Sequence, residues 1–330
     1  MSDPGSRRPA TEEQLLARIT GALQRATGQP PDGEIWIGDD AAVVHIPGTS
    51  VVLATDATVG GVHADLSLVS LDDLGWKALT AAVSDIGAMG AWPRHALVAL
   101  CAPPGTDVEL VNRGLAEAAA RWGCPIVGGD LSAASTVVVA VTVTGSVGEG
   151  PGPVTRSGAS PGDRLFLTGP LGASAAGLRL LRGPAAGSPA EGAARGSPGV
   201  GAGAGTPAAR HRRPLARLLE GWTARLAGAT AMIDVTDGLS LDLDRLARAS
   251  GVGARLDGVP VAPGATQAEA LGGGEDYELL IATPDGDRLR GAFARAGLRP
   301  PLPVGVCTDD PAERTLAGAP LGVSGWQHSF

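Results

Sequence analysis

The stretch LDDLGWKALTAAVSDIGAM, residues 71–89, repeats apolar side chains at helical spacing over about five turns. It predicts one long helix. The run HALVALCAPP (95–104) follows and predicts a strand, and a second helix is expected from about Asp107 to Trp122. A strand between two helices indicates a domain that mixes both kinds of element.

Further elements are predicted on both sides of this segment. The runs 41–46 and 50–55, which flank a Pro-Gly turn, predict a hairpin. The runs PIVGG (125–129) and STVVVAVTVTGSV (135–147) predict two more strands, and residues 11–26 predict a helix at the start of the chain. Strands and helices that alternate around one hairpin indicate an α+β domain of the split βαβ kind.

The chain is expected to divide near residue 150 into an N-terminal domain (1–150) and a C-terminal domain (151–330). The turn-rich segment RSGASPGD (156–163) opens the second half, and strands and helices alternate again after it. Residues 183–209 are almost entirely Gly, Ala, Pro and Ser, so we expect an exposed, disordered insertion there. The RHRR cluster at 210–213 is interpreted as the solvated start of a helix.

Composition excludes several classes of protein. The 330 residues are 44% hydrophobic and carry a net charge of −8, which indicates a folded domain protein and argues against nucleic acid or a membrane surface as partner. The three cysteines, Cys101, Cys124 and Cys307, lie far apart and in no zinc spacing, which indicates reduced thiols. Because no signal region and no long apolar run is present, we expect a cytoplasmic protein.

Aspartates follow several of the predicted strands, usually beside Gly, Ser or Thr. The set comprises Asp40, Asp56, Asp130, Asp234 and Asp237, with Asp85 in the long helix. Each alone is an ordinary turn or cap residue, but strand ends are where sheets present ligand sites, so their number favours one shared site. Asp39, next to Asp40, is expected to point the other way and to support the turn.

A cluster of carboxylates requires cations or protons. Two carboxylates about 5 Å apart repel by roughly 3 kcal/mol at an effective dielectric constant of about 20. An all-oxygen ligand set suits Mg²⁺ rather than zinc, and Mg²⁺ also binds substrate phosphates. The phosphate-binding loop GxxxxGK[ST] is absent, because the only lysine, Lys77, lies within a helix, and no protein-kinase motif is present. We therefore expect nucleotide chemistry at a site of another kind.

Eight motifs, taken in order, resemble those of the thiamine-monophosphate kinases, which belong to the aminoimidazole ribonucleotide synthetase-like superfamily. They are GDDAAV (38–43), ATDATVGGVH (54–63), GWKALTAAVSDIGAMGAWP (75–93), VGGD (127–130), TRSGASPGD (155–163), LTGPLGASAAGL (167–178), IDVTDGLSLDL (233–243) and GGEDYEL (273–279). The resemblance implies a two-domain α+β fold. In it, two copies of the N-terminal domain form a shared β-barrel in a homodimer, and the C-terminal domain is an α/β sandwich.

The resemblance also implies an activity and a set of site residues. The enzyme would transfer the γ-phosphoryl group of ATP directly to thiamine monophosphate, with several Mg²⁺ ions. The implied magnesium ligands are Asp40, Thr55, Asp56, Asp85, Asp130, Asp234 and Asp237, and five of them, Asp40, Asp56, Asp85, Asp130 and Asp234, are taken as catalytic. The implied nucleotide-binding residues are Gly129, Asp130, Arg156 and Thr236. The implied thiamine-phosphate ligands are His63, Glu275 and Trp326, the last from the terminal GWQHSF.

Simpler interpretations stay open for individual residues. Arg156 fits a surface arginine, His63 a hairpin residue and Glu275 a loop residue. The remaining histidines have no motif context and are interpreted as structural or solvated; they are His45, His95, His211 and His328.

Three rival functions are also considered. Aminoimidazole ribonucleotide synthetase is disfavoured by the GGEDYEL and GDDAAV motifs. Selenophosphate synthetase is disfavoured because the N-terminal segment lacks a reactive cysteine and a lysine. A non-catalytic nucleotide-binding regulator would tolerate loss of the metal carboxylates, and none is lost.

Overall fold

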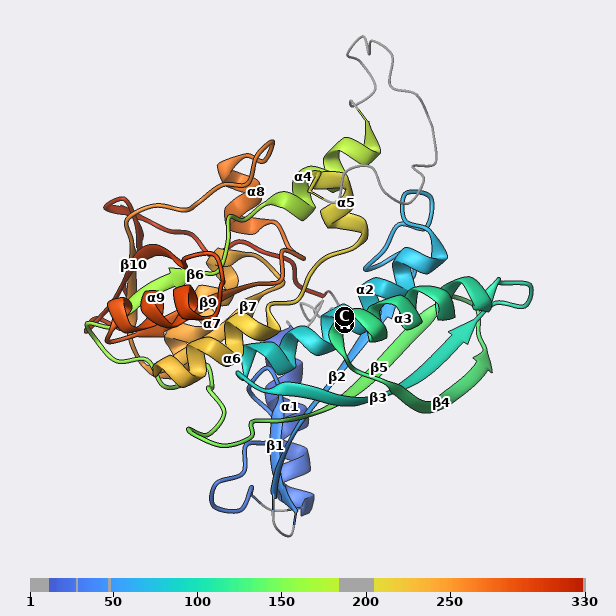
Figure 1. Cartoon of the computed structure of the whole chain (residues 1–330), viewed down its shortest axis with the longest axis horizontal. Helices are drawn as coiled ribbons and strands as arrows, with labels where there is room; N and C mark the ends of the chain where they lie inside the picture. The colour runs from blue at the N-terminus through green and yellow to red at the C-terminus, as the bar shows by residue number, and fades with distance from the viewer. Residues whose placement is uncertain (1–11, 28, 47–48, 184–204, 329–330) are drawn as a thin grey trace, which may run out of the picture.

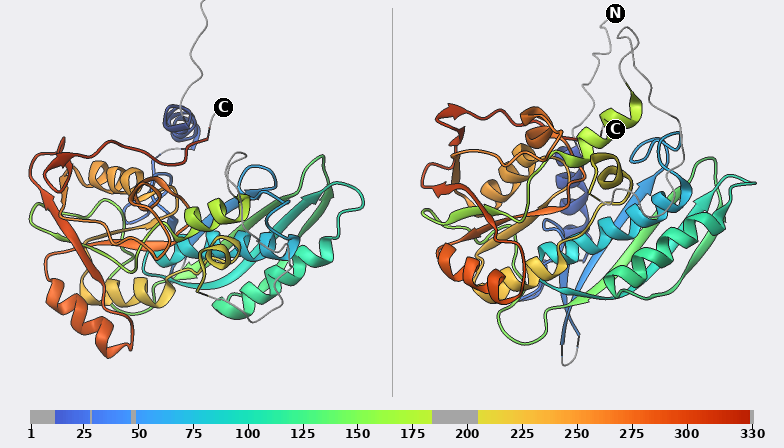
Figure 2. Two further views of the ribbon diagram at one scale, coloured as in Figure 1. Left: turned by 90° about the horizontal axis from the view of Figure 1, so that it is seen from above. Right: turned by 45° about the horizontal axis from the view of Figure 1, so that its top comes forward.

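The structure is a computed structural model of the 330-residue chain, and it describes residues 12–27, 29–46, 49–183 and 205–328. Two sheets occupy separate halves of the molecule (Figure 1; Figure 2). The long helix α2 (Leu71–Ala88) lies between them and packs against elements of both halves. This mixed architecture confirms the predicted α+β class.

The N-terminal half is a five-stranded sheet in the order β1-β2-β5-β3-β4, covered on one face by α2 and α3. Its elements are α1 (Glu12–Thr27), β1 (Ala42–Ile46), β2 (Thr49–Val59), α2, β3 (Trp92–Ala102), α3 (Val108–Trp122), β4 (Ile126–Ala133) and β5 (Val138–Ser146). The strands β1 and β2 form the predicted antiparallel hairpin, whose turn lies outside the described residues. Only β3 and β4 pair in parallel, with α3 as their connection.

Two glycines allow α2 and α3 to pack with their backbones nearly in contact. A Cβ atom on Gly75 would lie 2.1 Å from the carbonyl oxygen of Val111, and one on Gly114 would lie 1.7 Å from that of Asp72. Both distances are far below any real Cβ contact, so neither position accepts a side chain without separating the helices.

A Gly114→Ala variant is therefore expected to lower the free energy of unfolding by about 1–3 kcal/mol, although alanine is the better helix former. Urea unfolding of the purified protein measures this. Gly291→Ala is the matched control, because a Cβ there would meet only the end of Arg295, 3.3 Å away, and we expect no loss of stability. Equal effects of the two substitutions would contradict the close-packing argument.

The C-terminal half is a seven-stranded sheet in the order β12-β11-β8-β10-β6-β9-β7. Helices α6 and α9 cover one face and α7 and α8 the other, with an apolar core on each side. Its elements are β6 (Arg164–Leu167), α4 (Ala173–Arg182), α5 (Pro207–Arg212), α6 (Leu218–Ala227), β7 (Ala231–Val235), α7 (Leu239–Ser250), β8 (Gly253–Leu256), α8 (Gln267–Gly272), β9 (Glu278–Thr283), α9 (Gly286–Arg295), β10 (Leu302–Thr308), β11 (Arg314–Leu316) and β12 (Ala319–Pro320).

The expected disordered insertion at 183–209 lies mostly outside the described residues, and its last part is predicted wrongly. Residues 207–209 open helix α5, because the Thr206 hydroxyl accepts a hydrogen bond from the Ala209 N–H and Pro207 suits the first helical turn. The interpretation of residues 210–213 as solvated is also wrong. His211 is 4% exposed, and Arg213 forms ion pairs with three acidic residues of α2 and α3.

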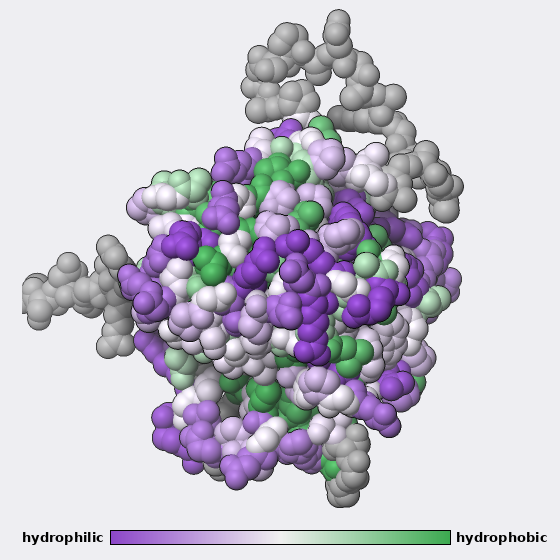
Figure 3. Space-filling view, turned by 60° about the vertical axis from the view of Figure 1, so that its left-hand side comes forward, coloured by the Kyte–Doolittle hydropathy of each residue, from purple (hydrophilic) through white to green (hydrophobic). Residues whose placement is uncertain are grey.

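The second face of the N-terminal sheet carries apolar residues without a covering helix. Leu97 and Val127 are 52% and 60% exposed on this face. By contrast, the face in Figure 3, on the side of the C-terminal half, shows hydrophilic residues interspersed with small apolar groups. None of the helices in the described ranges is long and apolar enough to cross a membrane.

Candidate active site

Three predicted carboxylates meet between the two halves. Asp40 lies in the bend before β1, Asp85 on the last turn of α2 and Asp234 on β7, and one oxygen of each lies within 4.8 Å of the others. The Ser84 hydroxyl donates a hydrogen bond to Asp234. Burial, reinforced by the neighbouring negative charges, raises the pKa values of Asp85 and Asp234 well above the ordinary range, and burial raises the pKa of Asp40 to about 6.

This cluster fits a magnesium ion. The Oδ2 atom of Asp40 is buried and has no hydrogen-bond partner among the described residues. Buried polar atoms are normally satisfied, and three converging carboxylates repel one another unless a cation or protons lie between them. Oxygen-only donors are the set that Mg²⁺ prefers. Asp40, Asp85 and Asp234 are therefore suited to hold Mg²⁺.

Arg156 borders the cluster. Its guanidinium pairs with the Asp40 carboxylate and lies 3.7 Å from Asp39. The Asp39 carboxylate also accepts the backbone N–H groups of Asp40 and Arg156, so it supports the loop as predicted. The expectation that Asp39 points away from Asp40 is wrong, because the bend before β1 lets both carboxylates face Arg156. The buried Nε of Arg156 has no hydrogen-bond partner in the described part of the chain.

The loop that carries Thr236 and Asp237 is shaped by a carboxylate that the sequence argument missed. Asp242 Oδ2 accepts three backbone N–H groups, from Thr236, Asp237 and Gly238, each at 3.1 Å. Arg245 links Asp237, at 2.5 Å, to Asp242, at 2.9 Å. Burial raises the pKa of Asp242 to about 7. The spacing DVTDGLSLD contains the signal, since an acid four to six residues after the loop residues can accept their N–H groups.

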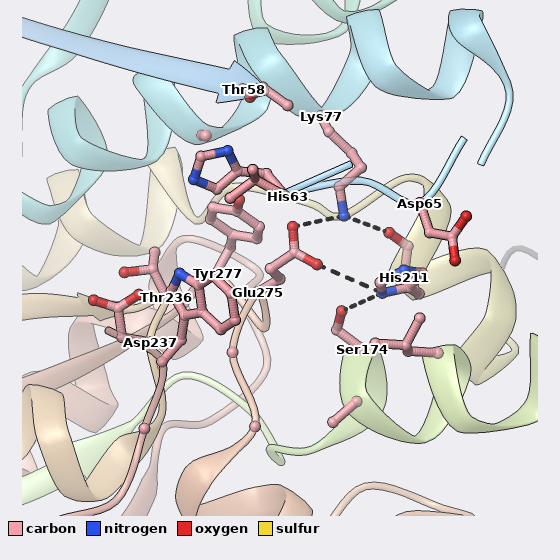
Figure 4. A pocket seen from close by; sticks show the side chains of 18 of the residues that line it. Thr58, His63, Asp65, Lys77, Ser174, His211, Thr236, Asp237, Glu275 and Tyr277 are labelled. Atoms are coloured by element: carbon pink, nitrogen blue, oxygen red, sulfur yellow. Dashed lines mark hydrogen bonds and ion pairs between the residues drawn. The ribbon is translucent and has the colours of Figure 1, made fainter. Parts of the chain in front are cut away.

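A cavity of about 850 Å³ adjoins the cluster, because Asp85 lines it; Figure 4 shows part of its lining. Asp56 and Asp85 line one part of it, together with Thr236 and Asp237, and His63, Glu275 and Trp326 line the rest. Burial raises the pKa of Asp56. Some of the predicted metal and nucleotide ligands therefore share one cavity with the predicted thiamine-phosphate ligands. The former are Asp56, Asp85, Thr236 and Asp237, and the latter are His63, Glu275 and Trp326.

The C-terminal segment closes the cavity against the N-terminal half. The Trp326 N–H donates to the carbonyl oxygen of Asp237 at 2.9 Å. The rings of Trp326 and His328 lie 5.9 Å apart, and those of His328 and His63 lie 5.1 Å apart, both edge to face. Burial and the adjacent His328 lower the pKa of His63, so His63 presents a neutral ring at pH 7. His328, which was interpreted as structural or solvated, thus lines the cavity.

Two further residues of the cavity were missed. Lys77, 1% exposed, forms an ion pair of 2.7 Å with Glu275 and donates to the carbonyl oxygen of His211 at 2.9 Å. The ring nitrogen Nδ1 of His211 lies 3.5 Å from Glu275 and 3.0 Å from the Ser174 hydroxyl. A lone lysine in an apolar helix is a signal for a buried partner, because a buried ammonium group must be paired.

Comparison with known proteins agrees with this geometry. Family models described as AIR synthase related protein match residues 38–147 with the N-terminal domain and residues 160–316 with the C-terminal domain. Thiamine-monophosphate kinase of Corynebacterium glutamicum is 36% identical over 281 residues, which cover 78% of this chain and 81% of that protein. The chain belongs to the thiamine-monophosphate kinase family. The Escherichia coli K12 member is 33% identical, with 84% of each chain covered.

A solved structure of the family has the same fold. It is described as "AaThiL complexed with AMPPCP and TMP", and it superposes with a TM-score of 0.77 at 29% identity, covering 96% of this chain and 97% of that one.

Two of the implied magnesium ligands, Thr55 and Asp130, lie apart from the cluster of Asp40, Asp85 and Asp234. Thr55 and Asp130 point to the face of the N-terminal sheet opposite α2, whereas Asp56 points toward α2. Thr55 contacts the Thr142 hydroxyl at 3.0 Å, and Asp130 accepts from Ser132 at 2.7 Å.

Gly129 has a packing role beside its implied nucleotide role. A Cβ atom there would lie 1.9 Å from the carbonyl oxygen of Val98, where β3 and β4 pair next to a register shift. The placement of aspartates at strand ends is wrong for two of them, because strand pairing continues for three residues past each: Asp56 pairs with Val141 and Asp130 with Ala99. Asp234 is the second-last residue of β7 and so lies at the predicted strand exit.

Proposed function

We propose that this chain transfers the γ-phosphoryl group of ATP to the phosphate of thiamine monophosphate, yielding thiamine diphosphate and ADP. One observation carries the proposal: a single cavity is lined both by the carboxylates Asp56 and Asp85 and by the rings of Trp326, Tyr277 and His63. The carboxylates suit metal-bound phosphates and the rings suit an aromatic cation. Family membership and the relative solved with AMPPCP and TMP support the same reaction.

The chain's own residues act by binding and positioning. The acceptor is a phosphate oxygen that is ionised at neutral pH, so no general base is needed and no phosphoenzyme is proposed. Mg²⁺ held by Asp40, Asp85 and Asp234, with Asp56 adjacent, would offset the repulsion between donor and acceptor phosphates. Arg156 is proposed to contact the nucleotide, since its buried Nε donor has no hydrogen-bond partner among the residues that the structure describes. Thr236 is proposed to bind the nucleotide, and Asp237 to bind metal.

We further propose a homodimer. The face of the N-terminal sheet opposite α2, with Leu97 and Val127 exposed, is the surface that a second copy would cover to complete a barrel. Edge strand β4 carries Asp130 on that face. In a dimer, Gly129, Asp130 and Thr55 would then serve nucleotide and metal binding at a site completed by both subunits.

Purified protein incubated with ATP, Mg²⁺ and thiamine monophosphate is expected to form thiamine diphosphate, measured by chromatography. Free thiamine is the matched control, and we expect no diphosphate from it, because the proposed acceptor is a phosphate oxygen. Turnover of an aminoimidazole ribonucleotide precursor, with thiamine monophosphate unreacted, would assign the chain to another branch of the superfamily instead.

A further inference from the structure

The backbone around Glu275 is fixed in an unusual conformation. Glu275 has φ +66°, in the left-handed region that side-chain-bearing residues seldom adopt, and Tyr277 has φ +52°. The Glu275 N–H donates to the carbonyl oxygen of Thr236 at 2.7 Å, and the Tyr277 N–H to that of Val235 at 2.9 Å. Such strain persists only where the surroundings hold it, and it clusters at ligand sites. Here it directs the Glu275 side chain across the cavity toward α2 (Figure 4).

Lys77 meets that side chain from the opposite half of the molecule. Its ammonium group is buried and contacts the Glu275 carboxylate and the carbonyl oxygen of His211. The Glu275 side chain itself remains 26% exposed, so the carboxylate faces both Lys77 and the open cavity. The ion pair therefore fixes a charged acceptor at the cavity wall rather than burying it completely.

His211 lies beside the second oxygen of the same carboxylate. Its Nδ1 lies 3.5 Å from Glu275 Oε2, and the Ser174 hydroxyl lies 3.0 Å from the same nitrogen. Burial, with the nearby Lys77 charge, lowers the pKa of His211 to about 4. The His211 ring is therefore neutral at pH 7. Lys77 is then the positive charge beside the Glu275 carboxylate, and His211 does not add a second one.

Helix α2 connects this pair to the carboxylate cluster. Lys77, Ala81 and Asp85 follow one another at intervals of four residues and all line the cavity. Eight residues of helix span about 12 Å. One rigid, buried helix therefore fixes the separation between the Glu275 carboxylate and the metal-binding end.

We infer that Lys77 and His211 are positioning residues for Glu275, and that through it they set the affinity for the non-phosphate part of thiamine monophosphate. This inference rests on the proposed function. It assigns a specific task to the only lysine of the chain. It also distinguishes substrate affinity from nucleotide affinity, because Lys77 contacts none of the carboxylates of the cluster.

The test is the kinetics of Lys77→Met. We expect KM for thiamine monophosphate to rise about 10- to 100-fold, with KM for ATP changed less than about 2-fold, because a misplaced Glu275 loses a contact made in both ground and transition states. Calorimetric binding of thiamine monophosphate should weaken in parallel. Arg213→Met is the matched control: Arg213 joins α5 to α2 through Asp73 but does not line the cavity, and both KM values should stay within about 2-fold.

A double-mutant cycle separates positioning from general stability. Glu275→Gln should add less than about 3-fold to KM in the Lys77→Met background, although it is costly alone, because the two residues act as one unit. The inference would be overturned if the KM increases of the two single variants multiplied in the double variant. It would also be overturned if KM for ATP rose as much as KM for thiamine monophosphate.

If Lys77→Met does not fold, the same kinetic measurement on His211→Asn tests the inference instead. We expect a rise of about 3- to 10-fold in KM for thiamine monophosphate only, and an unchanged value would overturn the inference. Failure of the wild-type protein to bind thiamine monophosphate would instead refute the proposed function.

Discussion

An Asp85→Asn variant is expected to lose about 10²–10³-fold in kcat, because a charge that neutralises the phosphates in the transition state is removed. Asp85 is the cluster member on α2, and an amide at this place keeps the shape of the side chain. The loss should appear in kcat and in kcat/KM alike, since the missing interaction belongs to the transition state. Initial rates at several Mg²⁺ concentrations measure it.

The same substitution should not destabilise the metal-free protein. The pKa of Asp85 is raised in the folded state, so its contribution favours folding at low pH and is lost as pH rises above the ordinary aspartate value of about 4. Metal-free wild type should therefore lose thermal stability as the pH rises above about 4, and Asp85→Asn should lose less. Added Mg²⁺ should raise the Tm of wild type more than that of the variant.

A buried aspartate outside the cavity provides the control for this experiment. Asp163 is 4% exposed and accepts hydrogen bonds from the Thr230 hydroxyl and the Ser160 N–H. Asp163→Asn should leave kcat within about 2-fold, whatever its effect on Tm. If Asp85→Asn kept wild-type kcat and the wild-type response to Mg²⁺, the cluster would not be the metal site.

Local patterns were sufficient for most of the fold. The apolar periodicity of residues 71–89 predicts α2, which is observed at Leu71–Ala88, and the paired short runs predict the β1–β2 hairpin. These elements follow from short-range physics: side-chain burial on one face and turn chemistry. The first half of helix α5 was missed because residues 207–209 continue a Gly/Ala/Pro-rich tract, and the stability of the helix comes from a cap and from packing that composition does not reveal.

The site was predictable only in part. Order of motifs identified Asp40, Asp85 and Asp234, which the fold brings together from segments almost two hundred residues apart. Lys77 and His211 were passed over because each was judged within its own segment, whereas their importance lies in a contact between the two halves. The signal was nevertheless present: Lys77 and Asp85 are polar residues eight positions apart on a helix that is otherwise largely apolar and buried, so they share one face.

Mixing two inactive variants, Asp85→Asn and Asp130→Asn, is expected to restore about a quarter of wild-type activity. Two strands, β5 and β3, separate β2 from β4, so at about 4.8 Å per strand Asp130 lies roughly 14 Å from the β2 position of Asp56. Its side chain also points to the other face of the sheet. Within one chain Asp130 is therefore badly placed to share a metal with Asp56 or Asp85, although the family resemblance implies that it does.

A second copy resolves this conflict if its β4 edge contributes Asp130 to the site. A mixed dimer would then contain one site with both substitutions and one site with neither. Random exchange makes half of all dimers mixed, and each of these has one active site of two, which gives about one quarter of the activity. Co-refolding the two variants at equal concentration and measuring thiamine diphosphate formation provides the value. The control is the same two variants refolded separately and then assayed together, so that their subunits do not exchange. If the co-refolded mixture is no more active than this control, Asp130 belongs to the site of its own subunit.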